Sequence, residues 1–336
     1  MSGTASAPRS GEDALIARHF APLATAAGAL ALTDDTAFYM PPPGFDLVLT
    51  KDAVAAGIHF LADDPGATVA RKALRVNLSD LAAKGATPVG YLLALGLPDG
   101  WTEAWLADFA AGLAADQQTY GVSLYGGDTI RTVERAVISI TAFGLVPTGG
   151  MVRRGAAQAG HRIVVTGTIG DAAIGLKLRL DAGLGGRLGL AAADADHLLD
   201  RYAHPQPRVA AAAVVRDHAR AAMDVSDGLV GDLRKMATTS GVAVRLDAAR
   251  VPLSPAAAAA VAADPALLVT AITGGDDYEI AAAVRPDAVA AFLDGCAAAG
   301  VAATEIGEAV TGEPGVTVTG GDGASLGIER GSFSHF

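Results

Sequence analysis

The stretch Arg75-Val76-Asn77-Leu78-Ser79-Asp80-Leu81-Ala82-Ala83-Lys84-Gly85-Ala86 organises the interpretation of the whole chain. Leu78 and Leu81 of this stretch and Leu74 just before it recur at helical spacing, which predicts a helix over residues 68–84. Thr68 is placed to cap the start of this helix, and Gly85 can take the left-handed conformation that ends one. The stretch is therefore the second half of a predicted helix with an apolar stripe.

Two polar side chains share another face of this helix. Asn77 and Asp80 are three positions apart, and polar groups in a buried helix need partners because their burial is otherwise costly. Taken alone, such a pair fits a solvated helix face as well as a functional site. The functional interpretation gains weight because aspartates recur in other short segments, mostly at predicted turns and element ends. These segments contain Asp34 with Asp35, Asp52, Asp128, Asp224 with Asp227, and Asp276.

Length and composition indicate a globular protein of two domains. The chain has 336 residues, more than one hydrophobic core usually accommodates, and 51% of them are hydrophobic. Predicted strands alternate with predicted helices, so the fold class is α/β or α+β. We expect a flexible tail over residues 1–12, an N-terminal α/β domain over residues 13–149 and a C-terminal α/β domain over residues 150–336.

Charge and cysteine content limit the possible partners and compartment. The formal charge of −11 disfavours nucleic acid or an anionic membrane surface as a partner. No apolar run approaches the ~18 residues of a membrane span, and the first residues lack the apolar core of a signal peptide. The single cysteine, Cys296, excludes an internal disulfide and a thiolate metal cluster. We expect a cytoplasmic protein that binds neither nucleic acid nor membrane.

Glycine-rich segments are predicted to be irregular. Gly126-Gly127-Asp128-Thr129 is predicted to be a turn, and residues 181–200 are predicted to include a surface loop. Residues 183–189 superficially match a dinucleotide-binding fingerprint, but the last glycine comes one position late and no strand precedes it. A Walker P-loop is excluded because the dipeptide Gly-Lys never occurs.

If the acidic segments converge, they indicate a site for divalent cations. Two carboxylates ~4 Å apart repel by about 4 kcal/mol at an effective dielectric constant of ~20, so a cluster needs cations to stay ionised. Magnesium suits such a site because it prefers hard oxygen ligands and keeps several waters, whereas the histidines lack the spacing of zinc ligands. The alternative is that each aspartate only caps a helix or turn. The residues alone thus favour a metal-dependent protein with a phosphorylated ligand, which they do not name.

Four motifs in this order and spacing carry a resemblance to a known family. They are Val76–Ala86, Gly126–Thr129, Asp224–Leu229 and Gly274–Glu279. Together they resemble the thiamine-monophosphate kinase family, in the aminoimidazole-ribonucleotide-synthetase-like superfamily. The resemblance covers nearly the whole chain, and the stretch Gly57-Ile58-His59-Phe60 with the aromatic tail favours this family over its purine, selenophosphate and hydrogenase-maturation relatives.

The resemblance implies a fold and a reaction. It implies two α/β domains with ATP bound in the cleft and an N-terminal sheet that pairs with its twin in a homodimer. The reaction would transfer the γ-phosphoryl group of ATP to the phosphate of thiamine monophosphate. Because the acceptor is already an anionic phosphate, catalysis would consist of alignment and charge neutralisation by several magnesium ions.

The resemblance also assigns expected roles to individual residues. Asp80, Asp128 and Arg154 are expected to be catalytic, and Gly127, Asp128, Arg154 and Ser226 are expected to contact ATP. His59, Asp276 and Phe333 are expected to contact thiamine monophosphate. The expected magnesium ligands are Asp34, Thr50, Asp52, Asp80, Asp128, Asp224 and Asp227.

Several positions depart from the family pattern. The family usually has glycine at Thr33, threonine at Lys51, glutamate at Asp276 and aspartate at Ser334. The Lys51 ammonium would either replace a cation or point away from the site, and we favour the second. Two alternatives therefore stay open: an ATP-dependent member of the superfamily with another acceptor, and a catalytically impaired nucleotide-binding module.

Overall fold

The computed structural model describes residues 11–328 and 331–332. The expected substrate contact Phe333 and most of the predicted tail lie outside the described residues. The chain forms two compact units, which are described separately. The first unit comprises residues 1–42, 49–77 and 88–143, and the second comprises residues 43–48, 78–87 and 144–336. The predicted boundary after residue 149 stays a prediction, and the second unit draws on both sides of it.

A four-stranded sheet forms the centre of the first unit. The strand order is β1-β4-β2-β3, and β2 and β3 run parallel. Buried and exposed residues alternate along much of β2, as expected for a sheet with one covered face. The strands are β1 (Phe45–Ala55), β2 (Thr87–Leu97), β3 (Ser123–Arg131) and β4 (Val137–Pro147).

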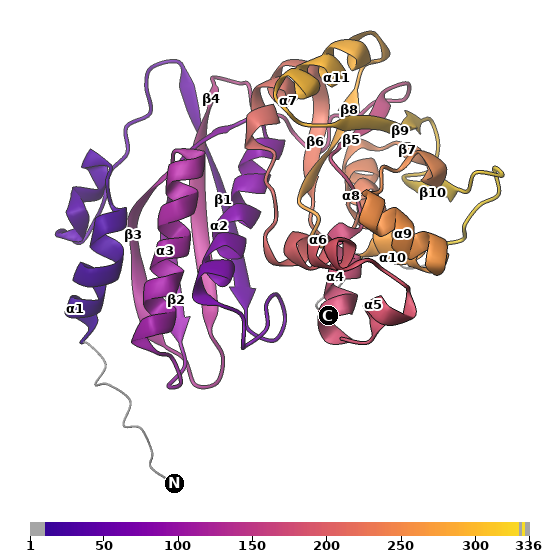
Figure 1. Ribbon diagram of the computed structural model, residues 1–336. Helices are drawn as coiled ribbons and strands as arrows, with labels where there is room; N and C mark the ends of the chain where they lie inside the picture. Colours follow the sequence, from indigo (N-terminus) through magenta and orange to yellow (C-terminus); the bar gives the residue numbers. More distant parts are fainter. Residues whose placement is uncertain (1–10, 329–330, 333–336) are drawn as a thin grey trace. The chain divides into compact units, whose positions relative to one another are not determined.

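Two long helices, α2 (Gly66–Ala83) and α3 (Glu103–Tyr120), lie side by side over this sheet (Figure 1). Glycine lets them approach closely, because a Cβ at Gly66 would collide with the backbone of α3. The predicted helix is confirmed, and Gly85 has the expected left-handed backbone with φ +72. Thr68 was wrongly predicted as the cap, because the helix already begins at Gly66.

Short helical segments precede the sheet in the first unit. These segments are short because this part of the sequence has no long apolar stripe and several small residues. They are α1 (Glu12–Leu15), the π-helical η1 (Ile16–Phe20) and the 3₁₀ segments η2 (Ala21–Leu23) and η3 (Ala27–Leu32).

A six-stranded, mostly antiparallel sheet forms the centre of the second unit. The strand order is β10-β7-β9-β5-β8-β6, and only the β10–β7 pair is parallel among the assigned pairs. Every residue of β8 is buried, so this strand is covered on both faces. The strands are β5 (Arg162–Thr166), β6 (Ala219–Val225), β7 (Ala243–Asp247), β8 (Glu279–Val284), β9 (Ala303–Val310) and β10 (Gly315–Thr319).

Helices cover both faces of this second sheet (Figure 1). Ile163 and Val165 pack on one face with α8, whereas Val164 packs on the other with α7 and α11. A third cluster packs α4, α6, α9 and α10 together. The helices are α4 (Asp171–Leu180), α5 (Leu184–Arg187), α6 (Ala192–Ala203), α7 (Ala212–His218), α8 (Leu229–Ser240), α9 (Pro255–Ala263), α10 (Leu267–Thr273) and α11 (Val289–Ala298), with 3₁₀ segments η4 (Val209–Ala211), η5 (Ala248–Arg250) and η6 (Pro286–Ala288).

The α/β class is confirmed, and one local prediction is wrong. Residues 126–129 are not a turn but lie inside β3. Residues 181–200, predicted to include a surface loop, contain α5 and most of α6 with a non-helical stretch at residues 188–191 between them, because leucines and alanines there support helix despite the glycines. Within the described residues, no helix is both long and apolar enough to cross a membrane.

Candidate functional site

A cavity of about 490 Å³ opens in the first unit beside β3. One part of its wall is apolar and includes Ile16, Phe20 and Leu32, and another part carries carboxylates. Across the described part of the chain, the carboxylates of Asp34 and Asp128 make no hydrogen bond or ion pair. Such a cavity offers an apolar surface to one end of a ligand and two open anionic groups to the other.

Gly127 places Asp128 at this cavity. Gly127 pairs with Leu93 of the neighbouring strand, and a Cβ at Gly127 would lie far inside contact distance of the Leu93 carbonyl oxygen. Only glycine allows β2 and β3 to approach this closely at that position. The glycines therefore shape a strand rather than the turn that the sequence predicted, and the exposed Asp128 follows them directly.

An unusual backbone segment brings Asp34 to the same cavity. Leu30, Ala31 and Leu32 are consecutive residues with φ of 50°, 52° and 55°, in the left-handed region. For residues other than glycine this conformation costs roughly 1–2 kcal/mol each, and strained backbone of this kind is concentrated at functional sites. The Thr33 hydroxyl donates a 2.7 Å hydrogen bond to the Leu30 carbonyl oxygen and closes the segment. No sequence pattern indicated this feature.

Strand β1 carries Thr50 and Asp52, and Asn77 ties it to α2. The Asp52 backbone N–H donates to Asn77 Oδ1 at 3.0 Å, and Asn77 Nδ2 donates to the Ala73 carbonyl oxygen at 3.0 Å. Asn77 is fully buried, so its polar group has the partners that burial requires. The Lys51 ammonium donates to Ser139 Oγ on β4 at 2.7 Å, so it interacts with the neighbouring strand.

His59 lies in the tight turn that follows β1. Its Nδ1 accepts a 3.2 Å hydrogen bond from the Ala55 backbone N–H. In a neutral imidazole this bond places the proton on Nε2, which makes Nε2 a hydrogen-bond donor.

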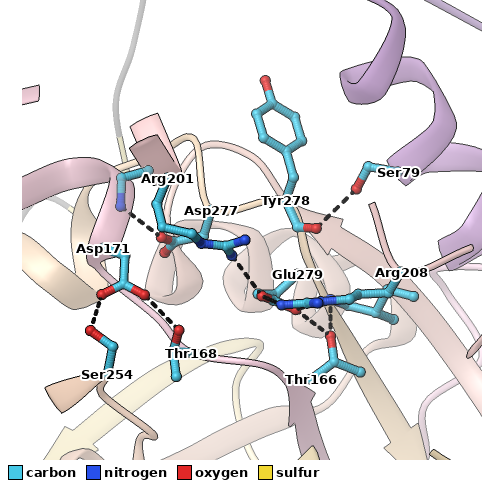
Figure 2. Close-up of polar contacts among 12 residues, drawn as sticks. Ser79, Thr166, Thr168, Asp171, Arg201, Arg208, Ser254, Asp277, Tyr278 and Glu279 are labelled. Carbon is cyan, nitrogen blue, oxygen red and sulfur yellow. Dashed lines mark hydrogen bonds and ion pairs between the residues drawn. The ribbon is translucent and has the colours of Figure 1, made fainter. Parts of the chain in front are cut away.

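In the second unit, three predicted segments come together. The Asp276 N–H donates to the Ser226 carbonyl oxygen at 2.8 Å, and the Tyr278 N–H donates to the Val225 carbonyl oxygen at 2.8 Å. Ser79 Oγ donates to the Tyr278 carbonyl oxygen at 3.3 Å (Figure 2). The end of α2 therefore lies against the Asp224–Leu229 and Gly274–Glu279 motifs.

Lys84 is a charged residue of this region to which the sequence analysis assigned no role. Its ammonium donates to the Ala222 carbonyl oxygen at 2.8 Å. Burial lowers the pKa of Lys84, and the nearby charge of Arg154 lowers it further. The negative charges of Asp224 and Asp80 oppose this shift. Lys84 is thus surrounded by three predicted site residues. Its position four residues after Asp80, in the helix predicted over residues 68–84, was a signal that could have identified it.

The carboxylate of Asp232 fixes the Asp224–Leu229 segment through hydrogen bonds to its backbone. It accepts hydrogen bonds from the backbone N–H groups of Ser226 at 3.0 Å and Asp227 at 2.9 Å. Burial raises the pKa of Asp232, and Lys235, which donates to it at 2.7 Å, opposes this shift. Lys235 also pairs with Asp227, so a cation at Asp227 would have to compete with this ammonium.

The Gly274–Glu279 turn has strained backbone at two residues. Asp276 has φ 74° and Tyr278 has φ 52°, both in the left-handed region. Aspartate tolerates this conformation better than most residues, whereas tyrosine does not. A Cβ at Gly275 would collide with the Ser226 carbonyl oxygen, so the turn lies directly on its neighbour.

The carboxylates fit magnesium in pairs rather than in one large cluster. Among the described residues, no group of three or more histidine, cysteine, aspartate and glutamate side chains could hold a metal ion. Magnesium needs only one or two carboxylates when phosphate oxygens and waters complete its shell. Asp34 and Asp128 line one cavity of the first unit, and Asp80 and Asp224 both interact electrostatically with Lys84 in the second. That the aspartates of both units converge stays a prediction.

Comparisons with known proteins agree with this arrangement. Residues 33–146 match AIR synthase related protein, N-terminal domain, and residues 158–320 match AIR synthase related protein, C-terminal domain. The thiamine-monophosphate kinase of Caulobacter vibrioides is 47% identical over 289 residues, which cover 85% of this chain and 80% of that protein.

Solved structures give the same result. The crystal structure of thiamine-monophosphate kinase from Stenotrophomonas maltophilia K279a is 37% identical, with a TM-score of 0.79 and coverage of 88% of this chain and 91% of that one. AaThiL complexed with AMPPCP and TMP is 30% identical, with a TM-score of 0.77 and coverage of 90% and 91%. The chain therefore belongs to the AIR synthase related proteins and, among these, to the thiamine-monophosphate kinase family.

Proposed function

We propose that this chain transfers the γ-phosphoryl group of ATP to the phosphate of thiamine monophosphate, which yields thiamine diphosphate and ADP. The observation that carries the proposal is the cavity where Asp34 and Asp128 present open carboxylates beside an apolar wall. A nucleotide has the matching chemistry, because its base is largely apolar and its phosphates bind magnesium. The related structure with AMPPCP and TMP supports both ligands.

The protein groups act by alignment and charge neutralisation. The acceptor phosphate is already an anionic nucleophile, so no side chain has to remove a proton from it. Arg154 is permanently charged and planar, which suits a phosphate oxygen, and Gly127 lets the backbone approach a ligand closely. Ser226 offers a hydroxyl beside Asp227. Asp80 and Asp128 complete the proposed catalytic groups.

Magnesium ions, when bound, would neutralise the charge of the phosphate oxygens. Mg²⁺ accepts carboxylate, hydroxyl and carbonyl oxygens as ligands. The residues proposed to hold these ions are Asp34, Thr50, Asp52, Asp80, Asp128, Asp224 and Asp227.

The acceptor side of the site is assigned to His59, Asp276 and Phe333. The hydrogen bond at His59 Nδ1 makes Nε2 the donor, which suits a phosphate oxygen. Asp276 presents a carboxylate from a strained turn, and it is one methylene shorter than the glutamate usual in the family. This difference makes the choice of acceptor the first property to measure.

We also propose a homodimer in the cytoplasm. Apolar side chains on the four-stranded sheet support the dimer: Leu49 is 63% exposed, Ile130 is 53% exposed and Val137 is 37% exposed. Exposed apolar side chains mark an interface where they gather into one patch. Sedimentation of the purified chain at micromolar concentration tests the dimer.

The function is tested by coupled detection of ADP with ATP, magnesium and a panel of acceptors. We expect turnover with thiamine monophosphate and none above background with aminoimidazole precursors or selenide. Turnover on another acceptor alone would move the chain to a different activity of the superfamily. An ATP-dependent rise in melting temperature without turnover on any acceptor would identify a binding module.

A further inference from the structure

Glu279, the first residue of β8, lies in a buried polar network of the second unit (Figure 2). Its side chain is fully buried. Thr166 Oγ1 donates to it at 2.8 Å, Arg201 Nη2 at 3.0 Å and Arg208 Nε at 2.6 Å, and Arg208 Nη2 makes a further contact. One carboxylate thus accepts hydrogen bonds from two guanidinium groups.

This network is not the arrangement expected if stability were its only role. Arg201 is 5% exposed, and its Nη1 has no hydrogen-bond partner among the described residues. Leaving a buried donor unpaired costs roughly 1–3 kcal/mol. Buried ion pairs contribute little net stability compared with apolar residues of the same volume, and the best-attested reason to keep them is a fixed geometry.

The geometry that the network fixes is that of the turn immediately before β8. Asp277 accepts hydrogen bonds from the backbone N–H groups of Gly170 at 2.8 Å and Ala172 at 3.4 Å, so the turn is attached at residue 277 as well as at residue 279. Tyr278, between the two attachments, and Asp276, just before the first, have left-handed backbone. Such conformations cost of order 1–3 kcal/mol each and persist only when the surroundings over-determine them.

We propose that Arg201 and Arg208 are positioning residues that fix the carboxylate of Asp276 for the phosphate acceptor. The arginines act through Glu279, and they contact neither nucleotide nor acceptor. The inference rests on the proposed function for its kinetic consequence, but its structural consequence is independent. Loss of the arginine–Glu279 contact releases the turn, and a released turn presents Asp276 in several orientations.

Arg208 is the better of the two arginines for a test. It follows Pro205-Gln206-Pro207 in the segment between α6 and η4, and its side chain is 18% exposed, whereas Arg201 lies on α6 and is 5% exposed. A glutamine at position 208 can reach water at this edge, so we expect Arg208→Gln to fold. Thr166 and Arg201 would still hold Glu279 in part.

The first measurement is steady-state kinetics of the full chain with ATP, magnesium and thiamine monophosphate. For Arg208→Gln we expect the KM for thiamine monophosphate to rise about tenfold, while the KM for ATP and kcat stay within about twofold. Arg208→Lys keeps the charge but loses the paired donors, so it should restore only part of the affinity. Arg162→Gln is the matched control, because Arg162 pairs with Glu308 at 3.1 Å in the same unit and is exposed.

A double-mutant cycle tests whether the arginine acts through Asp276. Asp276→Gly removes the carboxylate at a position whose φ suits glycine. In the Asp276→Gly background, Arg208→Gln should leave the KM for thiamine monophosphate unchanged within about twofold. Independent, multiplicative effects of the two substitutions would overturn the proposal, as would equal rises in the KM values of both substrates.

Hydrogen exchange supplies a readout that does not depend on activity. The amides of Asp276 and Tyr278 are hydrogen-bonded in the structure, so they should be protected in the wild-type chain. Arg208→Gln should speed exchange in residues 274–279 at least tenfold, whereas Arg162→Gln should not. Unchanged exchange there refutes the positioning role. Absence of wild-type turnover with faster exchange in the variant refutes the proposed function instead and retains the positioning role.

Discussion

Two sets of acidic residues, one in each unit, are held in opposite ways. In the first unit, Asp34 and Asp128 are exposed at a cavity and, within the described residues, their carboxylates make no hydrogen bond or ion pair. In the second unit, Asp171, Asp277 and Glu279 are buried, and each accepts hydrogen bonds from at least two groups. One set is open to a ligand, and the other is already saturated.

This difference separates the carboxylates that can bind a ligand from those that stabilise the fold. A carboxylate loses hydration when it is buried, and only fixed donors or cations compensate that loss. Saturated groups such as Glu279 have no capacity left for magnesium, whereas Asp128 keeps its full capacity. Replacing an open carboxylate with the amide of the same shape should therefore reduce activity. The same replacement at a saturated carboxylate should reduce stability.

The largest expected effect is the loss of activity in Asp128→Asn. The amide keeps the shape but removes the charge that a magnesium ion requires, so turnover should fall about a thousandfold. Because the side chain is exposed and makes no hydrogen bond or ion pair with the described residues, the free energy of unfolding should change by less than about 0.5 kcal/mol. Kinetics and urea denaturation of the same preparation measure both quantities. Near-normal turnover would remove Asp128 from the metal assignment.

The next effect is the loss of stability in Glu279→Gln. Removing this charge leaves the buried guanidinium group of Arg201 and the half-buried one of Arg208 without their shared counter-ion, which should lower the free energy of unfolding by about 3–5 kcal/mol. Denaturant unfolding measures the change, with the exposed pair partner Glu308→Gln as the matched control, for which we expect under about 1 kcal/mol. Equal effects of the two substitutions would contradict the division between open and saturated carboxylates.

The smallest effect is a pH dependence at Asp277. Burial raises the pKa of Asp277 well above its usual value, Asp171 and Glu279 add to this rise, and the Gly170 N–H and Arg201 oppose it. The folded state therefore binds the proton more tightly than the unfolded state, whose pKa is about 3.9. The resulting stabilisation is complete below that value and is lost as the pH rises through the folded-state pKa.

Asp277→Asn removes this titration. The stability of the variant relative to wild type should therefore increase as the pH rises from about 4 towards neutrality, by about 1.4 kcal/mol for each unit of raised pKa crossed. Urea unfolding of both proteins at several pH values measures the difference and cancels the titration of distant groups. Parallel curves would show that Asp277 has an ordinary pKa.

Much of the fold was predictable because it depends on local patterns. The leucine spacing before Gly85 is a local feature, and the helix that it predicts is confirmed. The prediction of a turn at Gly126-Gly127 failed because glycine there serves a close approach to Leu93, which is distant in sequence. Tertiary contact overrode local preference at that point.

The site was predictable as a set of residue types and not as a geometry. The motifs indicated Asp34, Asp128 and Asp224, but the left-handed segment before Asp34 has no sequence signature. The contacts of Glu279 with Arg201 and Arg208 join residues 78 and 71 positions apart, so no spacing rule could find them. The residue types of a site can be read from the sequence. Contacts between residues that are far apart in the sequence depend on how the chain packs.

The left-handed backbone at Asp276 has a consequence for how this position can change over time. Glycine and asparagine relieve the strain there, so a chain released from selection for the carboxylate gains stability by adopting either residue. Under the acceptor role proposed for Asp276, the carboxylate is kept despite this strain. In descendants or laboratory populations that are supplied with the end product, we expect glycine or asparagine at this position among the early substitutions.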